Sequence, residues 1–202
     1  MAVGPVWFAA GVTHQEETIA FASAEAFRAW LDVNHALSSG IWLKLRRESP
    51  GVVALDYAQA LDEALCYGWI DGRKAAFDDH WWLQRFTPRR PRSKWSKINR
   101  DKAAALIEQG RMHPAGQAEI DRAKADGRWE AAYDGARTAA VPDALTVALA
   151  ADPAAAAFFE TLDRQNRYAI LYRIQDAKKA ETRARRIEKY VAMLARGEKP
   201  HP

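Results

Sequence analysis

Residues suited to binding an anion are concentrated in one segment near the middle of the chain. Between Pro88 and Lys102 there are seven basic residues and a single acid, Asp101. Pro88 and Pro91 favour extended backbone, which spreads the arginines apart instead of placing them along one solvated helix stripe. The segment leads into a predicted helix that begins at Ser96, where the first N–H groups lack intrahelical partners and attract negative charge. Charged donors beside such N–H groups are typical of a phosphate or carboxylate site.

The predicted anion site combines this segment with one carboxylate from an upstream strand. Trp95 offers a ring face on which a base or aromatic group could stack. Asp71 lies between apolar strand residues, so we expect it to meet an arginine or another donor, or to orient the ligand. The alternative is a basic loop in which Ser96 only caps a helix and Trp95 fills the core. The residues expected to bind the ligand are Arg89, Arg90, Arg92, Ser93, Lys94, Trp95, Ser96, Asn99 and Asp71.

Other kinds of chemistry have little support in the sequence. The five histidines form no metal-binding pattern, and the single Cys66 excludes an internal disulfide and any multi-cysteine cluster. We therefore predict no metal and no cofactor, and we expect Cys66 to be a buried, unreactive thiol. Phosphate-loop, dinucleotide-binding and serine-hydrolase motifs do not occur. No catalytic motif is recognised, and an enzyme that uses Asp71 or Glu63 as a base beside the arginines remains an alternative.

The charge of the chain is divided unevenly along its length. The net charge is +4, but residues 1–80 carry −5 and residues 81–202 carry +9. Such a split favours a locally anionic partner, although a solvated basic face on C-terminal helices is the plainer explanation. No stretch approaches the roughly 18 apolar residues that a membrane span requires. The N-terminal segment lacks a basic region and a long apolar core, so it is not a secretory signal and we predict a cytoplasmic location.

The elements that must position these residues differ between the two halves of the chain. The first half alternates short strands with helices that begin after Ser23 and Asp56, whereas the pattern is helical throughout from Ser96 onward. The predicted fold class is α+β, with a small, mostly antiparallel sheet and helices, followed by a helical C-terminal region. We place a boundary near residue 140. The expected domains are an α+β domain with a Trp-rich core and the basic loop over 1–140 and a helical region over 141–202.

The sequence also predicts which tryptophans are buried and where the individual strands and helices lie. Trp30, Trp42 and Trp69 lie in apolar-periodic elements and should pack in the core, whereas Trp95 should be more exposed. The predicted strands are 18–22, 41–46, 69–76 and 80–87. The predicted C-terminal helices are 97–109, 114–125, 142–151, 153–162, 167–177 and 180–195.

Several motifs together resemble the YdeI/OmpD-associated family, whose members are also labelled bacteriocin-protection proteins. The resemblance extends from about Phe21 to Gly197. It implies a link to an outer-membrane porin and to survival of bacteriocins or antimicrobial peptides, without a known reaction or known catalytic residues. The motifs that carry it are GWIDGR (68–73), FTPRRPRSKWSKIN (86–99), the Gly110–Gly116 stretch, Ala123–Trp129 and Ala177–Ile187.

The sequence therefore favours a binding protein for an anionic or phosphorylated ligand that acts in stress or bacteriocin and antimicrobial-peptide resistance. The alternative in another class is a nucleic-acid-binding protein that uses the basic loop 88–102 and the basic helix around 183–189. The sequence indicates no particular protein partner.

Overall fold

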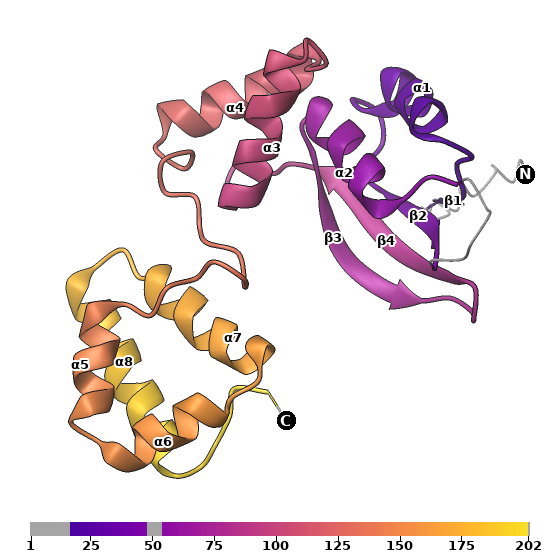
Figure 1. Cartoon of the computed structure of the whole chain (residues 1–202). Coiled ribbons are helices and arrows are strands. Elements are labelled where there is room, and N and C mark those ends of the chain that lie inside the picture. Colours follow the sequence, from indigo (N-terminus) through magenta and orange to yellow (C-terminus); the bar gives the residue numbers. More distant parts are fainter. Residues whose placement is uncertain (1–16, 48–53, 202) are drawn as a thin grey trace, which may run out of the picture. The chain divides into compact units, whose positions relative to one another are not determined.

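The computed structural model describes residues 17–47 and 54–201 (Figure 1). The expectation that the N-terminal segment is not a secretory signal falls almost wholly outside these residues. The described chain divides into two compact units. The first unit contains the residues up to Arg90 together with Met112–Ala118, and the second contains Pro91–Arg111 and the residues from Glu119 onward. The chain thus leaves the first unit after Arg90, returns to it for seven residues and leaves it again.

The first unit contains a four-stranded mixed sheet in the order β1-β2-β4-β3. β1 pairs in parallel with β2, while the pairs β2–β4 and β3–β4 are antiparallel, so the expected small and mostly antiparallel sheet is confirmed. The strands are β1 (Thr18–Ile19), β2 (Ile41–Arg46), β3 (Trp69–Ala76) and β4 (Trp81–Pro88).

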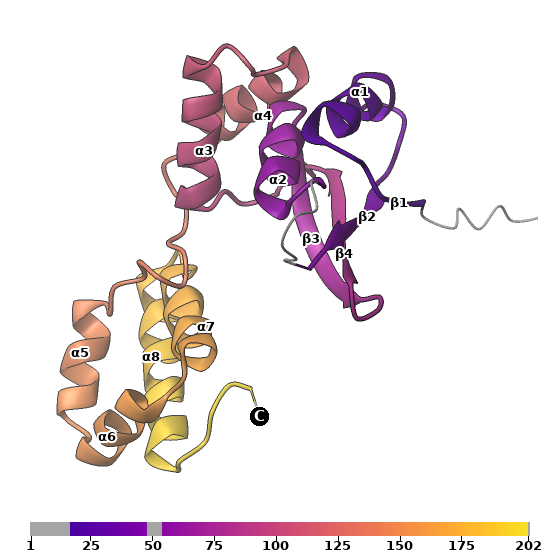
Figure 2. The same cartoon turned by 45° about the vertical axis from the view of Figure 1, so that its right-hand side comes forward.

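One face of the sheet is covered by two helices, α1 (Ala24–Asn34) and α2 (Tyr57–Cys66). The side chains of β2 alternate between buried and half-buried, as expected for a strand with one face against a core. α1 is capped by Ser23, and α2 begins at a complete capping box in which Asp56 accepts from the Gln59 N–H at 2.8 Å. In both views α2 lies alongside β3, which it contacts (Figures 1 and 2).

A bulge in β3 explains why a glutamine is buried in this core. Two residues, Gly72 and Arg73, lie opposite the single Arg85 of β4, so the ladder is interrupted there. Gln84 is fully buried, and its Nε2 donates to the Gly72 carbonyl at 3.0 Å and to the Arg85 carbonyl at 3.2 Å. The side chain thereby satisfies backbone oxygens that the bulge removes from regular pairing.

The returning segment of the first unit packs very closely against the end of α2. It contains the first turn of α4 (Pro114–Ala125), and the N–H of His113 donates to the carbonyl of Cys66 at 3.1 Å. Cys66 is buried, as expected. A Cβ on Gly116 would lie 2.1 Å from the Cys66 carbonyl oxygen, so this approach of one backbone to another requires glycine.

The second unit is almost wholly helical, which confirms the expected helical C-terminal region. α8 contacts α5, α6 and α7 (Figures 1 and 2), and their apolar faces share one core that includes Leu145, Phe159, Ile170 and Leu194. Among the described residues, no helix is both long and apolar enough to span a membrane. The helices are α3 (Lys97–Glu108), the remainder of α4, α5 (Asp143–Ala150), α6 (Pro153–Thr161), α7 (Arg164–Gln175) and α8 (Ala180–Ala195).

The start of α7 differs from the expected position by three residues. The helix begins at Arg164 because Asp163 caps it, accepting from the backbone N–H of Asn166 at 2.8 Å and from its side-chain amide at 2.9 Å. The apolar periodicity begins only further along the helix, so the capping residue Asp163 indicates the start of α7 better than the apolar pattern does.

Candidate functional site

A pocket of about 510 Å³ lies within the second unit, and we call it the basic pocket. Three segments line it: Pro91–Lys94, the stretch between α4 and Tyr133, and the end of α7 with the residues that follow. Pro91, Ala131 and Tyr133 supply apolar surface to its wall. Four cationic side chains and two carboxylates line the remainder, namely Arg92, Lys94, Arg128, Lys178, Asp126 and Asp176.

Arg128 is positioned by the turn that ends α4. Gly127 adopts a left-handed conformation with φ +77°, which stops the helix and directs the chain toward the pocket. The Arg128 guanidinium donates through Nη1 to the carbonyl of Ser93 at 2.7 Å and through Nε to Asp126 at 2.7 Å. The hydrogen bond from Arg128 lowers the pKa of Asp126 below its ordinary value, so this pair is ionised near neutral pH.

Backbone pairing holds the Arg92–Lys94 segment against the segment that follows α4. The N–H of Tyr133 donates to the Trp95 carbonyl at 3.0 Å, and the N–H of Lys97 donates back to the Tyr133 carbonyl at 2.8 Å. The rings of Trp95 and Trp129 meet edge to face beneath this bridge, with centroids 4.9 Å apart. The wall of the pocket is therefore built on a fixed backbone frame.

Lys94 is fixed by the end of α7. Its ammonium forms an ion pair with Asp176 and lies 5.5 Å from the centroid of the Tyr172 ring. The hydrogen bond to Asp176 raises the pKa of Lys94 above its ordinary value. Arg92 and Lys178 are exposed, and neither forms an ion pair with a residue in the described part of the chain. Two of the four cations in the basic pocket thus form ion pairs with carboxylates, and two do not.

The structure distributes the nine expected ligand-binding residues over both units. Arg92 and Lys94 line the basic pocket, and Ser93 contributes a carbonyl that Arg128 holds. Three of the nine belong to the first unit: Asp71, Arg89 and Arg90.

In the first unit the carboxylates considered as bases are each engaged by a donor. Asp71 is half-buried, and its Oδ2 accepts from the Tyr57 hydroxyl at 2.8 Å. Glu63 is buried and accepts twice from the Arg28 guanidinium, with both N–O distances 2.7 Å. Arg89 is also buried, whereas Arg90 is exposed. Asp71 therefore has its hydrogen-bonding donor in α2, a partner that the sequence did not indicate.

The expectation that Trp95 is exposed is wrong, because only 1% of the residue is accessible. The ring packs on Trp129 and cannot offer a free face for stacking. Ser96 caps α3 by accepting from the Asn99 N–H at 3.1 Å, and the neighbouring Lys97 N–H is taken by Tyr133. The positive charge at the pocket therefore comes from side chains and not from the start of α3.

Sequence reasoning missed Arg128 and Lys178 as members of the site. A local signal exists for Arg128, because it follows a glycine that ends a helix, a place where the chain turns sharply. Lys178 precedes the start of α8, where no ligand motif marks it. Arg128 and Lys178 line the same pocket as Arg92 although dozens of residues separate the three in the chain. A single sequence does not indicate such a long-range contact.

Asp134 follows Tyr133, whose backbone pairs with Trp95 and Lys97, and its ion pair can be tested by substitution. Its carboxylate receives Lys97 Nζ at 2.6 Å and the Gln175 side-chain amide at 2.8 Å. The hydrogen bond from Lys97 lowers the pKa of Asp134 below its ordinary value. A carboxyl group whose pKa is lower in the folded protein than in the unfolded chain stabilises the fold. This stabilisation is fully present at pH values above the ordinary pKa, and it is lost as the pH falls through the lowered pKa of the folded protein.

We expect Asp134→Asn to reduce the free energy of unfolding by about 0.5 kcal/mol near neutral pH, since Lys97 is partly exposed and solvent screens the pair. The deficit should begin to shrink as pH falls below the ordinary aspartate pKa of about 3.9 and should disappear only below the lowered pKa of the folded state, where the wild-type carboxylate is protonated too. Urea unfolding followed over a pH series measures this. The exposed Asp79 in the first unit serves as the control, and Asp79→Asn should change little at any pH. A deficit that persists unchanged in acid would contradict the assignment.

The fold and the pocket describe an α+β protein with a helical C-terminal region and a basic pocket. Two protein-family models match the chain: residues 19–119 match the family described as a domain of unknown function (DUF8412), and residues 138–197 match the one described as "Bacteriocin-protection, YdeI or OmpD-Associated". The chain therefore belongs to the first family, whose model covers half of it, and carries a domain of the second at its C-terminal end. Searches of the curated proteins and of the solved structures found no match.

The YdeI/OmpD-associated assignment is thus confirmed, with a smaller extent than expected. The resemblance was expected from about Phe21 to Gly197, but the matching model begins at residue 138. The motifs GWIDGR and FTPRRPRSKWSKIN lie in the stretch that matches the other family. The boundary near residue 140 stays a prediction.

Proposed function

We propose that the protein binds a phosphate-bearing or otherwise anionic small molecule in the basic pocket. The observation that carries this proposal is the set of four cations gathered from three segments, two of which have no ion-pair partner among the described residues. Cations without carboxylate partners around a concave surface create a positive potential that an anion relieves. The volume of about 510 Å³ is typical of small-molecule sites.

The four cations have different parts in this proposal. Arg92 and Lys178, both exposed, are the direct partners of the anion, since neither forms an ion pair with a described residue. Lys94 and Arg128 are held in place by Asp176 and Asp126 and supply further positive charge. Arg128 Nη2 is buried without a hydrogen-bond partner in the described chain, so a donor remains available after the other contacts of Arg128 are made.

The biological setting follows from the family of the C-terminal domain. The description of that family names bacteriocin protection, which supports a role in stress or antimicrobial-peptide resistance for the ligand-bound protein. A cytoplasmic location belongs to the same proposal. Nucleic-acid binding through the basic loop 88–102 stays a prediction, and salt dependence distinguishes it from binding of a small ligand.

Thermal unfolding with inorganic phosphate tests the proposal. We expect phosphate to raise the melting temperature of the wild-type protein through mass action once its concentration exceeds the dissociation constant. The double substitution Arg92→Ala/Lys178→Ala should abolish that rise while leaving the ligand-free melting temperature nearly unchanged, because both side chains are exposed and form no ion pair in the described structure. Arg90→Ala is the matched control, because it removes an exposed arginine from the same basic run without touching the pocket.

Two results would contradict the proposal. If phosphate raises the melting temperature of the double variant as much as that of the wild type, the cations of the pocket do not bind it. If the double variant instead loses the same stability with and without phosphate, the side chains are scaffold. An oligonucleotide that binds with a steep salt dependence, lost on changing the loop arginines, would favour the nucleic-acid alternative.

A further inference from the structure

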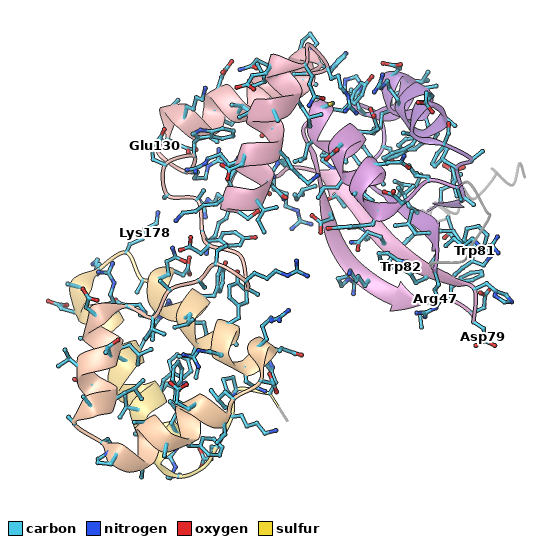
Figure 3. The ribbon with its side chains drawn as sticks, in the orientation of Figure 1. Arg47, Asp79, Trp81, Trp82, Glu130 and Lys178 are labelled. Carbon is cyan, nitrogen blue, oxygen red and sulfur yellow. The ribbon has the colours of Figure 1, made fainter. Side chains whose placement is uncertain are left out.

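The first unit contains a second pocket, which lies at the end of the sheet and which we call the sheet-end pocket. Its volume is about 740 Å³. The end of β2, the second half of β3, Trp82 of β4 and the start of α2 all contribute to it. Figure 3 shows Arg47 and Trp82 near the same end of the β3–β4 hairpin. The described residues that line it all belong to the first unit.

Positive charge dominates the wall of the sheet-end pocket. Arg46, Arg47 and Lys74 line it, and none of them forms an ion pair with a carboxylate in residues 17–47 or 54–201. Arg46 Nε is buried and has no hydrogen-bond partner within the same ranges, a state that is costly unless a ligand or water supplies an acceptor. Asp56 is the one acid among the described lining residues, and it already accepts the Gln59 N–H in the cap of α2.

Aromatic surface lies beside these cations. The rings of Tyr57 and Trp82 both line the pocket, with centroids 6.1 Å apart. The Lys74 ammonium lies 4.8 Å from the Trp82 centroid and 5.4 Å from that of Tyr57. Both rings are half-buried, and the Tyr57 hydroxyl is fixed by its bond to Asp71. An aromatic wall is thus placed next to positive charge that has no carboxylate partner in residues 17–47 and 54–201.

We infer that the sheet-end pocket binds a nucleotide, with the base against Trp82 and Tyr57 and the phosphate on the two arginines. Cations alone would suit any anion, and aromatic rings alone would suit any flat apolar group. A nucleotide has both parts within one molecule, and base–aromatic stacking does not depend on which base is present. Guanidinium groups match phosphate oxygens in geometry as well as charge. The inference stands on residues of the first unit and is independent of the basic pocket.

Isothermal titration with adenosine monophosphate tests the inference, using the protein with Arg92→Ala/Lys178→Ala so that the basic pocket does not contribute. We expect one nucleotide to bind per chain. Adenosine, which lacks the phosphate, and ribose 5-phosphate, which lacks the base, should each bind at least about tenfold more weakly, because each loses one class of contact.

Substitutions assign the binding to these residues. Arg47→Gln removes an exposed charge and Lys74→Gln removes the ammonium over the rings, and each should weaken binding about tenfold. Lys124→Gln is the matched control, because Lys124 lies 5.5 Å from the Trp129 centroid in the second unit and loses the same charge over the same kind of ring. The control should bind adenosine monophosphate as tightly as the parent protein. Circular dichroism establishes that each variant is folded before titration.

Three outcomes would overturn the inference. In the first, adenosine monophosphate does not bind the folded parent protein, including the case in which an oligonucleotide alone binds. In the second, ribose 5-phosphate binds as tightly as the nucleotide, so the rings have no part. In the third, Arg47→Gln, which removes an exposed side chain, leaves the affinity of the folded protein unchanged. Thermal unfolding of the basic-pocket variants in phosphate is a separate measurement, so each proposal can fail without the other.

Discussion

Gly116→Ala is expected to destabilise the first unit by about 3 kcal/mol or more, since overpacking against backbone leaves little room to relax. The added Cβ would lie 2.1 Å from the Cys66 carbonyl oxygen and 2.6 Å from the sulfur of Met112. The methionine can move, but the carbonyl belongs to the end of α2. At an ordinary helix position the same change would stabilise by up to about 1 kcal/mol, so the close approach reverses the sign.

Chemical unfolding of the variant measures this effect, and Gly72→Ala provides the control. A Cβ at Gly72 would meet its nearest neighbour, the Arg85 carbonyl oxygen, at 3.6 Å, which is ordinary van der Waals contact. The control should change stability by less than about 1 kcal/mol. If both variants unfold at the same denaturant concentration as the wild type, the contact between α4 and Cys66 is looser than described.

Trp95→Ala is expected to cost about 3–5 kcal/mol, the range for truncating a large buried aromatic. Only 1% of Trp95 is accessible, and its ring packs on Trp129 beneath the wall of the basic pocket. Trp69 is buried to the same degree in the first unit, so Trp69→Ala should cost a similar amount. Denaturant unfolding, monitored by circular dichroism, measures the loss of unfolding free energy in both variants.

The half-buried Trp81 supplies the comparison for these two variants. Trp81→Ala should cost clearly less than Trp95→Ala, because less apolar surface leaves water when the protein folds. A loss at Trp95 no larger than the loss at Trp81 would show that Trp95 is more accessible in solution than in the structure. It would also restore the possibility that its ring stacks on a ligand.

Local signals predicted much of the fold. Ser23 and Asp56 each cap a helix by accepting a backbone N–H three residues further on, as expected of residues at which helices begin. The strand predicted over 41–46 is confirmed, and Ile41, Leu43 and Leu45 alternate along it as the buried side chains. Such patterns are visible in one sequence because they depend on neighbours a few residues away.

The site was less predictable because its contacts are not local. Trp95 was expected to be more exposed than the other tryptophans, but it packs on Trp129, 34 residues further along. Among the tryptophans expected in the core, Trp69 is buried, while Trp30 and Trp42 are only half-buried. The basic run predicted Arg92 and Lys94 as lining residues of a positive pocket, whereas their companions come from elsewhere in the chain.

The path of the chain between the two units limits where recombination could separate them. Because Met112–Ala118 returns to the first unit, a gene-level exchange that joined a foreign sequence after Arg90 would remove the backbone that contacts Cys66. A breakpoint that preserves the first unit must therefore fall beyond residue 118. The family match over residues 19–119 ends just past this position. A gene segment that encodes the whole first unit therefore also encodes α3, although α3 belongs to the second unit.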